Sequence, residues 1–209
     1  MRKTEIDTNE VVIAGIITNL EYGFTCSGER FQKGTIKVER ISGTIDEVPV
    51  VISERILDKT IDYKEKFVEI KGNLRVYTDK TNRKKLLYVF VSEVFIPEYG
   101  AWNCNAVSLT GYICKDVHLR KTPISERDIA DVLIACNYRY GKTFYIPCIL
   151  WGRNAKYVSE LPIGTKLEMR GRFQSREYNK RIGEKEYEIR TAYEISVKEM
   201  IEVEADDKD

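Results

Sequence analysis

Histidine is nearly absent from this sequence, which holds His118 alone among 209 residues. One histidine cannot complete the His and Cys ligand set of a zinc site, and the five cysteines include no Cys-x-x-Cys pair. The signatures of phosphate-binding loops, dinucleotide-binding turns, metalloproteases and serine hydrolases are also missing. We therefore expect a protein that is not an enzyme and that uses neither a metal ion nor a cofactor.

Long apolar runs and net charge are lacking as well. The longest apolar run, residues 11–17, is about a third of the length that spans a bilayer, and the first residues contain no apolar signal core. The sequence thus predicts a cytoplasmic protein without a membrane segment. The 34 Lys and Arg balance 33 Asp and Glu, which argues against a polycation that coats duplex DNA. Charge is nevertheless uneven, because residues 115–198 hold 17 basic and 11 acidic side chains, whereas residues 199–209 hold six acids and one Lys.

An internal repeat is the clearest positive feature of the sequence. Three pairs of segments match in the same order: 9–17 with 105–113 (both Asn-x-Val-x-(Ile/Leu)-x-Gly-x-Ile), 48–52 with 146–150, and 68–72 with 167–171. Such ordered self-similarity is typical of a duplicated domain. Pro97 and Gly100 interrupt the pattern between two strand-like runs. We expect domains at residues 1–98 and 102–198, followed by a short acidic tail at 199–209.

Each half is predicted to be rich in strands. Between Val107 and Ile113 apolar residues alternate with polar ones, the period expected of a strand with one buried face. A helical pattern over residues 154–161 ends at Pro162 and Gly164. Three strands, a short helix and two strands fit a small barrel of the OB type. The expected fold class is all-β, with two tandem five-stranded OB-fold barrels, each with a short helix between the third and fourth strands.

Four segments of the second half carry a family resemblance. They are residues 105–111, 116–122, 146–155 and 164–178. Over about residues 103–201 the chain resembles the bacterial single-stranded DNA-binding protein family, and the first half looks like a more divergent copy. The resemblance implies OB folds that hold single-stranded DNA without reading its sequence, in DNA replication, recombination or repair.

The resemblance also implies which side chains bind. The stacking positions fall on Tyr140, Tyr145, Trp151 and Tyr178. Phosphate contacts are expected from Arg120, Lys121, Arg139, Lys142, Arg153, Arg172, Arg176, Lys180 and Arg181. A base stacked on an aromatic ring contributes roughly 1–3 kcal/mol, and each neutralised phosphate makes the affinity fall with salt. The corresponding stacking positions of the first half hold Thr44, Glu47, Ser53 and Asp79. The second domain is therefore expected to carry most of the binding.

Family members assemble four OB domains, so the resemblance implies a homodimer in which the first domain serves mainly the interface. The end of the sequence lacks the long linker and terminal Pro-Phe through which bacterial relatives recruit partners, so recruitment by that route is not expected. Two other functions stay open: RNA or tRNA binding or a primosome accessory role, and a module that binds only protein. Trp151 also fits a core position, and the basic hairpin around residues 179–183 also fits a solvated surface.

Overall fold

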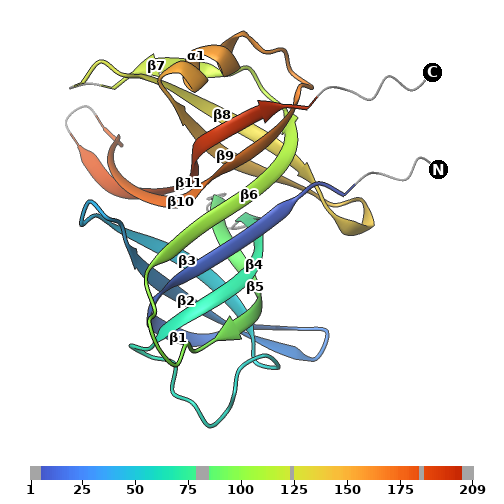
Figure 1. Cartoon of the computed structure of the whole chain (residues 1–209), viewed down its shortest axis with the longest axis vertical. Coiled ribbons are helices and arrows are strands. Elements are labelled where there is room, and N and C mark those ends of the chain that lie inside the picture. The colour runs from blue at the N-terminus through green and yellow to red at the C-terminus, as the bar shows by residue number, and fades with distance from the viewer. Residues whose placement is uncertain (1–5, 79–84, 123–124, 184–185, 204–209) are drawn as a thin grey trace.

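The computed structural model describes residues 6–78, 85–122, 125–183 and 186–203. Strands dominate this part of the chain (Figure 1), and their alternation of buried and exposed residues follows the sequence pattern. The elements are β1 (Asn9–Cys26), β2 (Glu29–Glu39), β3 (Ile45–Ser53), β4 (Phe67–Thr78), β5 (Lys85–Phe95), β6 (Cys104–Ile113), β7 (His118–Lys121), β8 (Asp128–Asn137), the 3-10 turn η1 (Arg139–Gly141), β9 (Thr143–Trp151), α1 (Arg153–Glu160), β10 (Lys166–Arg181) and β11 (Tyr187–Glu202). The all-β prediction is confirmed.

The N-terminal half, β1 to β5, closes on itself. β1 pairs with β2, β2 with β3, β3 with β5, β5 with β4, and β4 with β1, which makes a closed five-stranded barrel. In the C-terminal half, β6 to β11, the pairings run β6, β10, β11, β9, β8 and return to β6. β7 is an added short strand that pairs with β8. The alternation at β7 spans only four residues, so the sequence pattern did not predict it.

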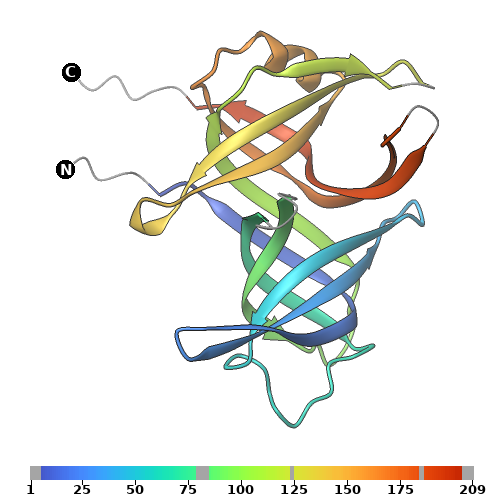
Figure 2. The same cartoon turned by 180° about the vertical axis from the view of Figure 1, so that it is seen from behind.

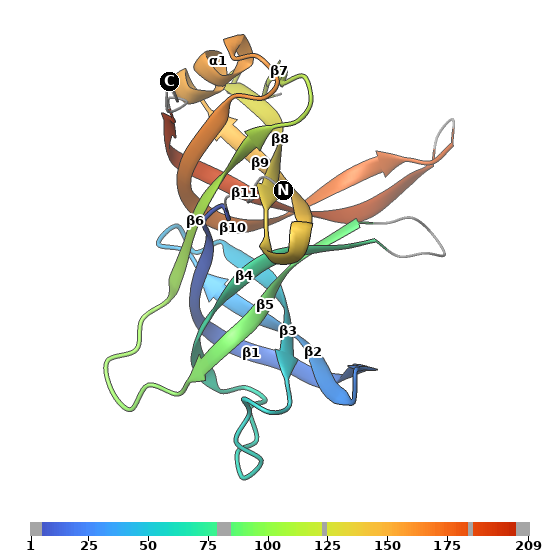
Figure 3. The same cartoon turned by 90° about the vertical axis from the view of Figure 1, so that its right-hand side faces the viewer.

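The two halves are joined through their first strands. β1 and β6 pair antiparallel and lie side by side in the middle of the molecule (Figures 1 and 3). Asn9 is opposite Leu109, Val11 opposite Val107, and Ile13 opposite Asn105. Because Asn9 and Asn105 match in the repeat, as do Ile13 and Leu109, the pairing is symmetric about Val11 and Val107. The halves are therefore related by an approximate two-fold axis, as in an isologous interface between identical subunits.

The repeated asparagine has the same structural role in each half. The Asn9 side chain donates to the carbonyl of Leu74 at 2.9 Å and accepts the Leu74 N–H at 2.7 Å. The Asn105 side chain makes the same two bonds with Phe173, both at 2.8 Å. Buried backbone groups need hydrogen-bond partners, and these amides supply them where β4 and β10 bend.

The repeated glycine lies just before that bend. β4 has an irregularity at Gly72, and β10 has one at Gly171. A Cβ on Gly72 would lie 2.3 Å from the carbonyl oxygen of Phe90, and one on Gly171 would lie 2.2 Å from that of Ser196. Any side chain would push the paired strands apart, so both barrel corners require glycine.

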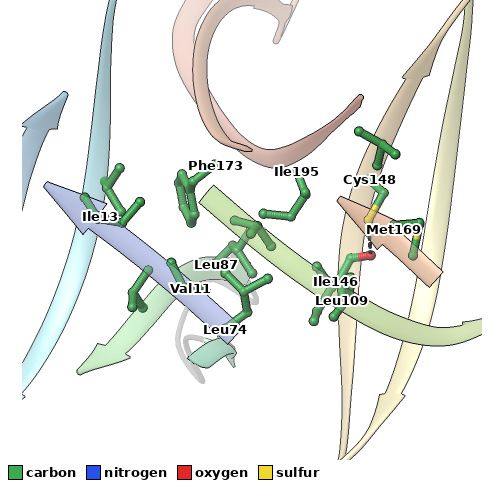
Figure 4. Packing of buried hydrophobic residues seen from close by; sticks show 14 of the residues in the cluster. Val11, Ile13, Leu74, Leu87, Leu109, Ile146, Cys148, Met169, Phe173 and Ile195 are labelled. Atoms are coloured by element: carbon green, nitrogen blue, oxygen red, sulfur yellow. Dashed lines mark hydrogen bonds between the residues drawn. The ribbon is translucent and has the colours of Figure 1, made fainter. Parts of the chain in front are cut away.

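A single buried cluster fills both halves. Its members come from the inward faces of the strands and include Val11, Ile13, Leu74, Leu109 and Phe173. Figure 4 shows Val11 and Ile13 of β1 close to Leu74 and Phe173, so that the core continues past the β1–β6 pair. The two halves therefore stabilise each other by shared burial of apolar surface.

The predicted helices differ between the halves. In the C-terminal half, α1 lies between β9 and β10. The helix expected between β3 and β4 is wrong, since residues 54–66 form turns. The Asp58 side chain accepts the Thr60 N–H at 2.9 Å, and the Asp62 side chain accepts the Lys64 N–H at 3.0 Å. Such bonds offer the backbone a turn in place of a helix.

The predicted start of the tail, at residue 199, falls inside β11. Glu199 pairs with Arg170, and the strand continues to Glu202, whose carboxylate accepts the Tyr157 hydroxyl at 2.9 Å. Residues 204–209 lie outside the described residues. No helix in the described ranges is long and apolar enough to cross a membrane. The same ranges contain no group of three His, Cys, Asp or Glu side chains placed to hold a metal ion.

The cysteines differ sharply in exposure, which makes thiol reactivity a test of the core. Cys26 is exposed at the end of β1, whereas Cys136 and Cys148 are buried, and burial raises the pKa of the Cys136 thiol to about 12. At about pH 8 a disulfide reagent should modify Cys26 first, and Cys136 and Cys148 only as fast as the protein unfolds, because thiolates react and thiols do not. Fast labelling that survives Cys26→Ser and maps to Cys136 would contradict this packing.

The raised pKa of the Cys136 thiol also makes folding stability depend on pH. Between about pH 9 and 12 the unfolded chain loses the Cys136 proton while the folded chain keeps it. Folding stability should therefore fall as the pH rises through that window.

Candidate nucleic-acid interface

The outward face of β9 carries two of the predicted stacking residues. Strand residues alternate, so Tyr145 and Trp151 point away from the core, whereas Ile146, Cys148 and Leu150 between them are buried. Tyr145 is opposite Ala135 of β8, and its ring is 49% exposed. Six residues of strand separate the two rings by about 20 Å, and between them on the same side of the strand Ile149 is only 1% exposed.

Trp151 is half-buried and held in place. Its Nε1–H donates to the Ser196 hydroxyl at 3.2 Å, and the Arg127 guanidinium lies 5.6 Å from the ring centroid. The sequence also allowed a core position for Trp151, and the half-buried side chain fits that alternative only in part. Trp151 is a lining residue of two grooves.

Tyr140 and Tyr178 do not share that face. Tyr140 lies in η1, the turn between β8 and β9, with a left-handed backbone (φ 60°) and a 95% exposed side chain. Tyr178 lies on β10, opposite Arg190, with the Arg176 guanidinium 5.8 Å from its ring. Figure 2 shows the yellow β8–β9 turn and the orange-red β10–β11 hairpin on opposite sides of the C-terminal half. The structure therefore brings Tyr145 and Trp151 onto one surface and places Tyr140 and Tyr178 at its two ends.

Five of the predicted phosphate contacts are available cations. They are Lys121, Arg139, Lys142, Arg153 and Lys180. All five are exposed, and none forms an ion pair within the described ranges. They are spread over β7, the β8–β9 turn, α1 and the β10–β11 hairpin, around the aromatic face.

Three other predicted contacts are already paired within the protein. Arg120 binds both oxygens of Asp131, at 2.6 and 3.0 Å, and this bond raises the pKa of Arg120. Arg176 lies 3.4 Å from Glu194. Arg172 lies 3.8 Å from Asp46 of β3. These pairs lower the charge that the three arginines offer to a phosphate.

Arg181, the last of the predicted cations, is exposed near the end of β10. Its Nε–H donates to the Gly183 carbonyl at 2.9 Å. This bond fixes the side chain against its own hairpin and leaves the charge at the surface.

A basic groove beside Trp151 was not predicted. It has a volume of about 730 Å³, and Arg127, Asn154, Arg170 and Lys198 are among its lining residues. Arg170 is next to the repeated Gly171, and Lys198 continues the alternation of β11, so both were visible in the sequence as outward-facing strand residues. The sequence did not show that these two side chains lie near Trp151, because β9, β10 and β11 come together only in the folded protein.

A buried carboxylate connects the two halves behind this surface. Asp46 is 0% exposed, and both of its oxygens accept from the Arg40 guanidinium. The Ser175 N–H of β10 also donates to Asp46, at 3.1 Å, and the Ser175 hydroxyl accepts the Glu47 N–H at 2.8 Å. The bond to Asp46 raises the pKa of Arg40, whereas burial and the neighbouring Arg40 lower the pKa of Arg172. Arg172 therefore belongs to a junction between the halves, although the sequence predicts it as a surface phosphate contact.

The matching positions of the N-terminal half offer no rings. Thr44 and Glu47 are exposed, with Glu47 3.5 Å from Lys37, and the Ser53 hydroxyl donates to Glu29. Asp79 lies outside the described residues.

A closed five-stranded barrel with aromatic and basic side chains on an outward sheet face defines the class of OB-barrel proteins. Residues 104–202, which make up the C-terminal half, match the model of the single-strand binding protein family. The wild-type single-stranded DNA binding protein of Thermus aquaticus is similar over 98% of this chain and 97% of its own, with 20% identity and a TM-score of 0.74.

Two further comparisons complete these findings. A deletion mutant of the Thermus aquaticus protein matches 96% of this chain with the same identity and TM-score. The N-terminal domain of PriB protein from Thermoanaerobacter tencongensis is 33% identical over 44% of this chain and 98% of its own, with a TM-score of 0.38. No curated protein matches the chain.

Proposed function

We propose that this protein binds single-stranded DNA with little sequence preference, by stacking bases on aromatic rings and by neutralising phosphates with the surrounding cations. The observation that carries the proposal is the outward face of β9, where Tyr145 and Trp151 lie exposed or half-exposed among unpaired basic side chains. Aromatic rings accept any base, since every base has a π-face. The match of residues 104–202 to the single-strand binding protein family supports this assignment.

The wider role extends from this activity. The protein protects or presents single strands in the cytoplasm during replication, recombination or repair, as a binding protein without a catalytic step. Two tandem OB-fold domains, with boundaries near residues 1–98 and 102–198, organise the chain, and two chains assemble into a homodimer with four such domains. The approximate two-fold symmetry of the β1–β6 pair supports the tandem arrangement, because each half contributes the same strand.

A salt titration tests the phosphate contacts. If the five available cations each neutralise one phosphate, the affinity for oligo-dT should fall with a slope of roughly −3.5 in log Kobs against log salt, at about −0.7 per contact for a single strand. Lys142→Gln should make the slope less steep by about 0.7. Lys59→Gln, a change in the 54–66 loop of the other half, is the matched control and should leave the slope unchanged. A slope that is the same in all three proteins would contradict the assignment of Lys142.

Competition separates the proposal from its alternatives. Labelled oligo-dT should be displaced by unlabelled oligo-dT at much lower concentration than by poly-U or duplex DNA. Preferential displacement by poly-U would favour an RNA task. Absence of oligo-dT binding at low salt would overturn the proposed function.

A further inference from the structure

The N-terminal half carries an aromatic groove of its own. The groove has a volume of about 710 Å³ on the outward side of β2, β3 and β5, and its rings are Phe24, Tyr77, Tyr88 and Tyr193. Tyr77 is 51% exposed and Phe24 is 38% exposed. Tyr193 comes from β11, so the C-terminal half completes the groove.

Contacts with neighbouring side chains hold Phe24 in place within this groove. Phe24 stacks on Phe31 with centroids 5.0 Å apart and an angle of 19°, so one face of the Phe24 ring is covered by protein. Phe31 contacts Phe90 at 5.7 Å, and the Arg75 guanidinium lies 3.5 Å from the Phe90 ring. The Lys33 ammonium is 5.8 Å from Phe24. Rings fixed before binding lose little conformational entropy when a base stacks on them.

These aromatics occupy positions that the C-terminal half fills differently. Counting from Gly72 and Gly171, Tyr77 corresponds to Arg176. Leu74 pairs with Val89 as Phe173 pairs with Ile195, so Tyr88 corresponds to Glu194 and Phe90 to Ser196. The rings of the two halves thus occupy positions that do not match, although Tyr77 of β4 and Tyr178 of β10 lie on corresponding strands. Matching by the repeat therefore placed no ring at the four stacking positions of the first half.

The aromatic groove of the N-terminal half adjoins a further groove, which Trp151 lines together with residues of both halves. A junction groove of about 690 Å³ is lined by Trp151, Arg172 and Arg176 of one half and by Lys37, Arg40 and Glu47 of the other. β2 and β3 run from this junction groove, at Lys37 and Glu47, to the aromatic groove, at Thr35 and Pro49, and β11 does the same from Thr191 to Tyr193. Neighbouring outward residues on a strand lie about 7 Å apart, so the two grooves are contiguous on all three strands.

Contacts between the two halves hold the junction groove and the aromatic groove next to each other. β10 lies against β3, and β11 lies against β5. Figure 3 shows the β10–β11 hairpin extending above the ends of β4 and β5. The Asp46 and Ser175 bonds fix the same junction.

Resting on the proposed function, the geometry points to one continuous track: we propose that a single DNA strand bound at Trp151 crosses the junction groove and stacks further bases on Phe24 and Tyr77. The aromatic and aliphatic side chains of the aromatic groove suit bases, and its charged lining residues are Lys33 and Glu21. A strand long enough to reach both halves is bound by both, whereas a strand that covers one barrel is held at Trp151 alone.

Two lengths of oligo-dT test the track. One of about 8 nucleotides falls within the site size of a single OB barrel, and one of about 30 exceeds it. Two variants test the groove: the single change Tyr77→Ser, at a half-exposed position, and the double change Phe24→Ala with Tyr77→Ala. Each should weaken binding of the long oligonucleotide, the double variant by at least about 10-fold. Each should leave the affinity for the short oligonucleotide within about 2-fold of wild type. Tyr22→Ala is the matched control, because Tyr22 is 56% exposed on β1 and is not among the residues that line the groove.

Photo-crosslinking locates the strand directly. A long oligo-dT with 4-thiothymine should crosslink to peptides that contain Phe24 or Tyr77, and the short one should crosslink only in the C-terminal half. Equal long-strand affinity in wild type and both variants, or crosslinks confined to the C-terminal half, would overturn the track and leave the Trp151 site standing. A wild-type protein that binds neither length overturns the proposed function itself, and the track with it.

Discussion

The variant in which Tyr140, Tyr145, Trp151 and Tyr178 are all changed to alanine is expected to bind oligo-dT at least about 10³-fold more weakly than wild type. Each base–ring stack contributes roughly 1–3 kcal/mol, and about 1.4 kcal/mol is a factor of ten. The loss should be unequal, because Tyr145 and Trp151 share the face of β9 while Tyr140 and Tyr178 lie at its ends. We therefore expect the Tyr145 and Trp151 pair to account for more than half of the change in binding free energy. Fluorescence anisotropy at low salt measures it.

Controls separate stacking from folding. Tyr157→Ala is matched to Tyr145→Ala, since the two residues are 48% and 49% exposed, and the Tyr157 hydroxyl donates to Glu202 at the end of β11. It should leave the affinity within about 2-fold. Trp151→Phe keeps a ring but loses the bond from Nε1 to Ser196, so it should retain most of the binding. An alanine variant that stays folded by circular dichroism and binds as wild type does would refute the stacking assignment.

Asp46→Ala is expected to destabilise the fold by about 3–5 kcal/mol and to lower the unfolding midpoint by about 10 °C. The carboxylate is fully buried and accepts from Arg40 and from the backbone of Ser175, and Arg172 lies beside it. Its removal leaves two guanidinium groups close together without their counter-charge and takes away a bond between the halves. Thermal unfolding and urea titration measure the effect.

The neighbouring Glu47→Ala provides the comparison. Glu47 is exposed, and its ion pair with Lys37 is 3.5 Å long between half-exposed side chains. Surface pairs of this kind contribute about 0–1 kcal/mol, so this variant should unfold close to wild type. Equal midpoints for the Asp46 and Glu47 variants would show that the buried contact does not hold the halves together.

Much of the architecture was predictable because it depends on the alternation of apolar and polar residues along each strand. The alternation from Val107 to Ile113 predicted β6, and the matching segment in the first half predicted the corresponding part of β1. The outer portions of β1 and β10 carry few buried residues, so their alternation is weak and their length was not predicted. The helix expected from the barrel type is missing at residues 54–66, where the side chains of Asp58 and Asp62 accept backbone N–H groups in turns.

The site was predictable in part. The family resemblance identified Tyr145 and Trp151 as stacking residues, and both lie on β9 at positions of the same strand face. Whether a cation is free depends on partners from other strands, and for Arg120, Arg172 and Arg176 those partners are Asp131, Asp46 and Glu194. Arg127 and Lys198 line the groove beside Trp151 because folding brings their strands and loops together, and the sequence did not predict this.

By itself, the sequence determined the all-β class, the internal repeat, and the face of β9 that points outward, because each depends on residues a few positions apart. The tertiary structure decided how β1 and β6 join the halves, which arginines keep their charge for a ligand, and how Tyr193 of one half completes a groove on the other. Those features depend on residues of different strands, whose separation in the sequence ranges from 11 for Arg120 and Asp131 to 129 for Asp46 and Ser175. Their interaction exists only after the strands have paired and the buried surface has fixed the distance between them.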